Sequence, residues 1–166
     1  MKSFFQSERL SFRYFREEDF EDYFSLMSNL PVMKMITGKA LSRKEAEKKF
    51  QDALESEDIE KGLGRFRVST RDNDDFVGLA RLVPGDSAPE LGYALASDQW
   101  GRGYGSEICK AVIDHARQYG KYKKLMAIVD PENLPSVRIL KKNGFVFERA
   151  GEYEGLPAEY YVRNGR

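Results

Sequence analysis

The chain has 166 residues, in which 27 lysines and arginines balance 27 aspartates and glutamates. This length suits a single domain with one hydrophobic core, and we expect residues 1–166 to form it. The zero net charge excludes a general electrostatic attraction to nucleic acid or to an anionic membrane. Any anion-binding site must therefore be local.

The cysteine content and the apolar runs indicate a compartment. The single cysteine, Cys109, has no partner for an intramolecular disulfide, which is typical of a reducing environment. No apolar run approaches the roughly 20 residues of a membrane span, and the first residues lack the apolar centre of a secretory signal. We expect a cytoplasmic monomer or homodimer with neither nucleic acid nor membrane as a partner.

The first half of the chain begins with a strand and two helices. Apolar and polar residues alternate over 10–14, which predicts a half-buried strand. Apolar residues then recur at helical spacing over 20–27, so a helix is expected to end before Pro31. Ser42 and Glu45 form a capping box in front of a second helix, whose apolar stripe runs to residue 54.

The second half of the chain is predicted to contain both strands and helices. Residues 66–70 and 77–83 predict an antiparallel hairpin, and residues 90–96 a further strand. A helix follows to residue 119, where Gly120 is expected to supply a left-handed end. Further along come a buried strand at 125–129, a helix opened by Pro135 and closed by Gly144, and strand-like pieces to residue 162. The chain is expected to be an α/β (α+β) protein.

Three closely spaced glycines precede the helix that is expected to end near residue 119. Gly101, Gly103 and Gly105 lie between a predicted strand and a predicted helix, where exposed N–H groups and the helix dipole favour an anion. No Gly-Lys-Ser/Thr follows, which excludes a Walker A loop, and Ser106 stands where a Rossmann fingerprint requires glycine. The segment is either a phosphate cradle or a glycine-rich turn that only begins a helix.

Several motifs together resemble the GCN5-related N-acetyltransferase (GNAT) family. The sequence RGYG at 102–105 is similar to the R/Q-x-x-G-x-G/A motif of that family, and NLPSVRILKKNGF at 133–145 is similar to its second signature. The stretches ERLSFRYFREEDFEDYF and PELGYAL resemble the Rim-type subgroup of ribosomal-protein N-terminal acetyltransferases. The resemblance covers nearly the whole chain. It departs at Trp100, where arginine or glutamine is common, and at Leu140, where many members have a tyrosine that acts as general acid.

The resemblance implies a fold and a co-substrate. The fold is a mixed, mostly antiparallel sheet of about six to seven strands with about four helices, splayed between the strand at 90–96 and the strand at 124–130. The co-substrate is acetyl-CoA, with its pyrophosphate on the glycine loop and its pantetheine arm along the splayed strand. The implied cofactor-binding residues are Tyr93, Ala94, Leu95, Gly101, Arg102, Gly103, Tyr104, Gly105, Ser106 and Asn133.

The resemblance and the chemistry of acetyl transfer suggest two catalytic side chains. Glu90, in the position of a catalytic glutamate in some members, is the candidate base for the attacking amine, although it is also readable as a surface carboxylate. Backbone N–H groups of residues 93–95 are the candidate oxyanion donors. Ser136, at a position where the Rim-type subgroup often has serine, is the candidate proton donor to the departing sulfur, since Leu140 has no proton to give. Its other reading is a hydroxyl that satisfies the first helical turn.

Other polar residues favour structural roles. His115 has no second histidine for a metal site, and Cys109 has no partner for nucleophilic catalysis, so no metal is expected. Arg65, Arg67 and Arg81 on the predicted hairpin are compatible with an acidic substrate and equally with the polar side of a sheet.

The resulting hypothesis is an N-acetyltransferase that moves acetyl from acetyl-CoA to a primary amine through a ternary complex. The acceptor is either a protein N-terminus or a small-molecule amine. The alternative is a non-catalytic acyl-CoA-binding or partner-binding module on the same fold, and a nucleotide-binding protein is a more remote reading.

Overall fold

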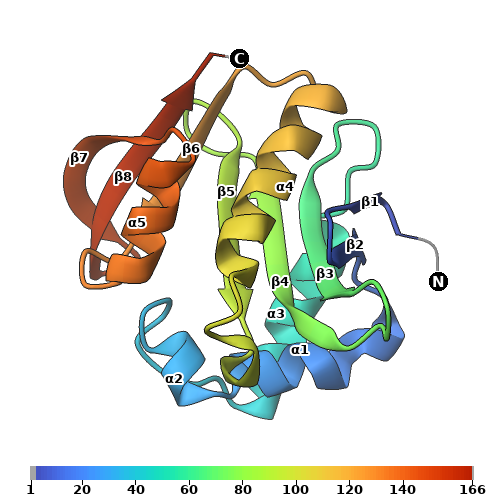
Figure 1. The fold of residues 1–166 in the computed structure, drawn as a ribbon. Helices are drawn as coiled ribbons and strands as arrows, with labels where there is room; N and C mark the ends of the chain where they lie inside the picture. Colours follow the sequence, from blue (N-terminus) through green and yellow to red (C-terminus); the bar gives the residue numbers. More distant parts are fainter. Residues whose placement is uncertain (1–2, 166) are drawn as a thin grey trace.

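A computed structural model describes residues 3–165 as helices packed against an eight-stranded sheet (Figure 1). The strands are β1 (Phe5–Gln6), β2 (Leu10–Tyr14), β3 (Gly64–Thr70), β4 (Phe76–Val83), β5 (Glu90–Leu95), β6 (Lys124–Val129), β7 (Val146–Tyr153) and β8 (Leu156–Asn164). The helices are α1 (Phe20–Met27), α2 (Leu30–Met33), α3 (Arg43–Glu55), α4 (Tyr104–Gln118) and α5 (Leu134–Lys142), with 3-10 turns at Glu17–Asp19 and Ser97–Gln99.

The strand order is β1-β2-β3-β4-β5-β6-β8-β7, and among these neighbours only β5 and β6 run parallel. The mixed, mostly antiparallel architecture implied by the resemblance is therefore confirmed. Among residues 3–165 the element counts are slightly higher than expected, because the sheet has eight strands and there are five α-helices. The two-residue β1 and the four-residue α2 are too short for a periodic pattern in the sequence to reveal.

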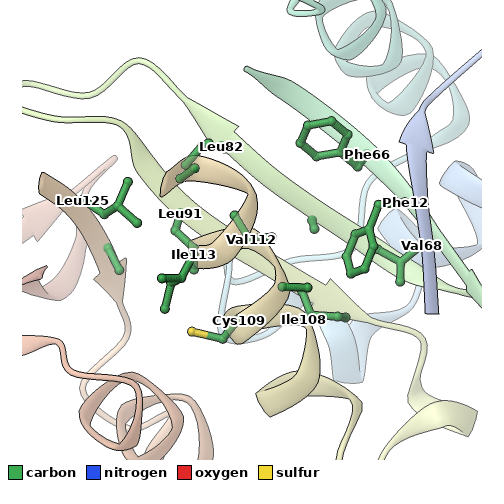
Figure 2. Close-up of a cluster of buried hydrophobic side chains, with 14 of the residues drawn as sticks. Phe12, Phe66, Val68, Leu82, Leu91, Ile108, Cys109, Val112, Ile113 and Leu125 are labelled. Carbon is green, nitrogen blue, oxygen red and sulfur yellow. The ribbon is translucent and has the colours of Figure 1, made fainter. Parts of the chain in front are cut away.

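Helices cover both faces of the sheet. The larger core cluster joins α4 to the central strands, and Ile108, Val112 and Leu91 are among the side chains that meet in it (Figure 2). A second cluster joins α1 and α3 to the opposite face, where it includes Leu79 and Ala94. Because β5 contributes Leu91 to one cluster and Ala94 to the other, both of its faces are covered.

The ends of the helices follow local chemistry with one exception. Ser42 and Glu45 form the reciprocal capping box expected at the start of α3. Gly144 has φ +89° and ends α5 as expected. Gly120, however, does not supply the left-handed residue after α4, because Lys121 does so with φ +60°. A Cβ at Gly120 would lie 2.2 Å from the Tyr122 ring, so this position requires glycine for space.

Within the described residues, no helix combines the length and the apolar character that a membrane crossing requires.

Candidate active site

The site begins where β5 and β6 separate. Their register contains a single pair, Glu90 with Met126, and the Met126 N–H donates to the Pro89 carbonyl at 2.9 Å. Beyond that pair the strands diverge, as expected for the splay between 90–96 and 124–130 (Figure 1). The facing edges therefore leave ladder groups available to an extended ligand.

A cavity of about 280 Å³ fills this gap. Its walls include Leu91 and Tyr93, which pack with the α4 cluster, and also Leu79 and Ala94, which belong to the α1/α3 cluster. A cavity that touches both clusters passes through the plane of the sheet, which is possible only where two strands are parted. The cavity therefore reaches side chains on both faces of the sheet.

The glycine loop, residues 101–105, leads into the first turn of α4, and its three glycines have different functions. Gly101 and Gly103 have φ +76° and +81°, a conformation that side chains disfavour. A Cβ at Gly101 would meet nothing within 4 Å among the described residues, and one at Gly103 would meet only Arg9 at 3.5 Å. Gly105 differs, because its Cβ would approach Ile139 of α5 at 3.1 Å. The first two glycines shape an open loop, and the third allows two helices to pack.

Gly103 is the N-cap residue of α4, and no side chain within residues 3–165 caps that helix end. Its first N–H groups and the positive end of its dipole are thus available to an anion. The loop side chains turn to other partners. The Trp100 indole donates to the Leu95 carbonyl at 3.0 Å, and the Arg102 guanidinium lies 3.5 Å from the Asp98 carbonyl. The buried ring of Tyr104 packs under Arg9, and Ser106 is half-buried in the first turn.

Tyr93 and Ser136 form a hydroxyl pair in the wall of the cavity. The Tyr93 and Ser136 hydroxyl oxygens are 3.3 Å apart, and both residues line the cavity together with Leu140. Burial raises the pKa of Tyr93 to about 12, so the phenol keeps its proton at neutral pH. The sequence analysis assigned Tyr93 only through its backbone. Tyr93 lies on the same face of β5 as Leu91 and Leu95, which places its ring on the α4 side of the sheet. Its partner Ser136 is 43 residues away in the chain.

Asn133 performs the capping role that was the other reading of Ser136. The Asn133 side-chain oxygen accepts from the Ser136 N–H at 3.3 Å at the start of α5. The Ser136 hydroxyl is therefore not needed for that N-terminus and remains directed to Tyr93. Asn133 also lines the cavity.

Glu90 is buried at the junction of β5 and β6, and it is not a surface carboxylate. It pairs with Arg81, which lines the cavity, whereas Glu90 itself does not. The Arg81 side chain also lies over Gly92, since a Cβ there would be 2.6 Å from its Nε atom. The carboxylate is therefore connected to the cavity through Arg81.

The three arginines on strands β3 and β4 fall into two groups. Arg67 is buried between carboxylates, 3.1 Å from both Asp22 and Asp74, and has a structural role. Arg65 and Arg81 line the cavity. The sequence left open whether these arginines contact a substrate or form the polar side of the sheet. Arg67 has the second role, and Arg65 and Arg81 are placed where a substrate could reach them.

His115 and Cys109 are core residues. The His115 Nε2 lies 2.9 Å from the Gly62 carbonyl, its ring stacks on Phe5, and burial lowers its pKa. Burial raises the pKa of the Cys109 thiol to about 12. Among residues 3–165, no group of three or more His, Cys, Asp or Glu side chains is arranged to hold a metal ion.

Solved structures with this architecture include several acetyltransferases. The GNAT-family acetyltransferase from Bacillus anthracis superposes with a TM-score of 0.82 at 22% identity, with 96% of each chain covered. Spermidine N-acetyltransferase from Vibrio cholerae, in complex with CoA and spermine, gives 0.77 at 17% identity, covering 94% of this chain and 95% of that one. RimL, a ribosomal L7/L12 N-terminal acetyltransferase in complex with coenzyme A, gives 0.78 at 17%, covering 95% of both chains. The Rim type is one of several similar subgroups.

Sequence comparison identifies the family. The YkkB protein of Bacillus subtilis is 25% identical over 162 residues, covering 95% of this chain and 93% of that protein. The N-acetyltransferase YnaD of Bacillus subtilis, itself uncharacterised, is 28% identical over 140 residues, covering 83% of this chain and 79% of YnaD. A family model described as the acetyltransferase (GNAT) domain matches residues 9–146. Because that match spans most of the chain, the protein belongs to the GNAT acetyltransferase family.

Proposed function

We propose that the chain transfers an acetyl group from acetyl-CoA to a primary amine while both substrates are bound. The observation that carries this proposal is the cavity that crosses the sheet between β5 and β6. It joins a wall with two hydroxyl groups on the α4 side to a floor with charged side chains on the α1/α3 side.

The residues of the site fit acetyl-CoA. Gly101 and Gly103 leave open space above the loop, and the uncapped start of α4 favours the charge of a pyrophosphate. The edge of β5 at residues 93–95 has no β6 partner, so it can bind the amides of a pantetheine arm. The proposed loop contacts come from the backbone of residues 101–106, and Asn133 is proposed to contact the arm from the other side. When bound, acetyl-CoA supplies an acetyl group that is already activated as a thioester.

The proposed chemistry of this chain has three parts. Backbone N–H groups of residues 93–95 stabilise the negative charge that develops on the acetyl oxygen. Ser136 gives its proton to the departing sulfur and is resupplied by Tyr93, the adjacent neutral phenol. Glu90 accepts the amine proton through water, because its carboxylate does not reach the cavity directly. This arrangement does not require the tyrosine that other members have in the place of Leu140.

The experiment is a screen of amines and peptide N-termini with release of CoA as the readout, followed by Ser136→Ala. For the best acceptor we expect kcat to fall on the order of 100-fold, as for loss of a general acid, while the Kd for acetyl-CoA stays unchanged. Tyr93→Phe is expected to lower kcat by a smaller factor, because Ser136 retains its own proton. Ser87→Ala, which removes an exposed hydroxyl outside the cavity, is the matched control.

Two results would contradict the proposal. If acetyl-CoA bound but no amine caused CoA release, the chain would be an acyl-CoA-binding module. If acetyl transfer occurred with the same kcat in Ser136→Ala and in the Ser87→Ala control, the assignment of the proton donor would be wrong.

A further inference from the structure

Two arginines face each other in the floor of the cavity. Arg65 of β3 and Arg81 of β4 are directly opposed in the antiparallel register, and both line the cavity. Like charges in opposed positions of a sheet repel each other and lower stability. The pair therefore needs a compensating negative charge.

Among residues 3–165, only one of the two guanidinium groups has a carboxylate in ion-pair contact. Arg81 pairs with Glu90, whereas Arg65 makes no ion pair or hydrogen bond with any residue in the described range 3–165. Burial, followed by the repulsion of Arg81, lowers the pKa of Arg65. The charges of Asp52 and Glu90 oppose this lowering, although neither carboxylate forms an ion pair or hydrogen bond with Arg65. A guanidinium group remains charged in proteins, so Arg65 is a partly desolvated cation whose donors have no carboxylate in contact among the described residues.

A neighbouring pair of arginines shows how the same sheet balances such charges. Arg13 of β2 and Arg67 of β3 are also directly opposed. Asp19 accepts two hydrogen bonds from Arg13, at 2.8 and 3.0 Å, and Asp22 and Asp74 each lie 3.1 Å from Arg67. Three carboxylates thus form ion pairs with the two arginines outside the cavity, while one carboxylate forms an ion pair with one of the two arginines inside it.

We propose that Arg65, with Arg81, binds a carboxylate group of the acceptor, so that the substrate class is amines that carry a carboxylate close to the amine. This inference rests on the proposed function and specifies its acceptor. The planar guanidinium fork fits a carboxylate with two parallel hydrogen bonds. The bound carboxylate would form an ion pair with Arg65, as Asp19 does with Arg13.

The other charged residues of the cavity agree with a substrate that has both signs of charge. Lys49 and Asp52 of α3 are exposed at its edge, and Asp130 and Glu154 line its remaining walls. These three acids can attract the ammonium form of an amine before it loses its proton. The two guanidinium groups in the floor disfavour acceptors that carry only positive charges.

Pairs of acceptors that differ only in the carboxylate test the proposal. We would compare α-amino acids, β-alanine and γ-aminobutyrate with their amides, and add spermidine as a polycation. We expect kcat/KM for the acids to exceed that for the amides by about tenfold to 100-fold, the range for hydrogen bonds to a charged group. The amides have the less basic amines, which favours them chemically, so a preference for the acids reports recognition.

Arg65→Met then isolates the guanidinium group. In this variant we expect the ratio of kcat/KM between acid and amide to fall to about one, and Arg65→Lys to keep part of the preference because it keeps the charge. Arg117→Met removes an exposed cation of α4 outside the cavity and should leave the ratio at its original value. Binding is measured separately, as the rise in Tm that the best acid gives in the presence of CoA.

The outcomes separate the two proposals. If acids raise the Tm of the unaltered protein but not of Arg65→Met, the inference stands, even if no acetyl transfer is found and the proposed function fails. If amines are acetylated but the amides or spermidine match the acids, the inference is overturned and the function stands. A preference for a dicarboxylic acyl-CoA donor, with no acceptor preference, would also overturn it, because the arginines would then recognise the donor.

Discussion

His115, the single histidine of the chain, shows what burial does to one residue. Its ring lies in an aromatic cluster with Phe4 and Phe5, and one nitrogen is 2.9 Å from the Gly62 carbonyl. Burial lowers its pKa below the usual value of 6.5, which the Gly62 carbonyl only partly opposes. The folded protein therefore keeps this side chain neutral at a pH where an exposed histidine begins to bind a proton.

This shift predicts a dependence of stability on pH. In the unfolded chain the histidine binds a proton as the pH falls through about 6.5, while the folded chain does not, so the free energy of unfolding decreases below that pH. Aspartate and glutamate ordinarily titrate near pH 4, so the interval from about pH 7 to 5.5 isolates this residue. Urea denaturation at several pH values measures the slope. His115→Phe should flatten it, and an unchanged slope would contradict the assignment.

At the scale of elements, the loop before α4 combines a backbone requirement with the proposed binding surface for acetyl-CoA. Gly103 has φ +81° and is the N-cap residue of the helix, so the same residue sets the direction of the chain and leaves the first N–H groups uncovered. A side chain at this position strains the backbone and extends into the open space above the loop. We therefore expect a substitution here to change both the stability of the fold and the affinity for acetyl-CoA.

We expect Gly103→Ala to lower the free energy of unfolding by about 1–2 kcal/mol, the cost of a left-handed conformation with a Cβ. It should also weaken acetyl-CoA binding, measured by calorimetry. Gly155→Ala is the matched control, because this glycine has φ +83° in the β7–β8 turn, a Cβ there would have open space, and it lies outside the glycine loop. If both variants lost stability equally and neither lost affinity, the loop would only begin a helix.

The β3–β4 hairpin shows how far the sequence alone could lead. Alternation and helical spacing located its strands and most other elements, and the glycine motif located the loop, since these depend on neighbours in the chain. The separation of Arg65 from Arg67 depends on carboxylates supplied by α1 and by a turn, which periodicity does not reveal. The pairing of Tyr93 with Ser136 and the role of Asn133 as the cap likewise required the two strands to be placed beside α5.

At the scale of the whole molecule, Asp19 connects the helical layer to the sheet. It lies just before α1, is buried, and accepts hydrogen bonds from Arg13 of β2 and from the Arg16 N–H. Burial raises the pKa of Asp19, but the hydrogen bonds from Arg13 and Arg16 lower it by a larger amount. The pKa of Asp19 is therefore below its usual value. One carboxylate thus fixes the start of α1 against the face that forms the floor of the cavity.

Asp19→Asn is therefore expected to lower the free energy of unfolding by about 3–5 kcal/mol, because it leaves Arg13 buried without its counter-charge. Urea denaturation near pH 7 provides the measurement. Asp22→Asn is the control, since the Asp22 carboxylate is much more exposed than that of Asp19 and Arg67 keeps Asp74 as a partner, so a loss of about 1 kcal/mol or less is expected. An equal decrease in the free energy of unfolding in the two variants would show that the Arg13–Asp19 pair contributes no more to stability than the Arg67–Asp22 pair.

The single register pair between β5 and β6 has a consequence for the free protein. Five strands lie on one side of this junction and three on the other, and a ladder that stops after one pair leaves a seam in the sheet. An extended ligand in the seam would act as a missing strand and hold the two parts together. The free protein therefore has fewer contacts holding its two parts together at this junction, and acetyl-CoA, if it binds there as proposed, would stabilise the junction while it stays bound.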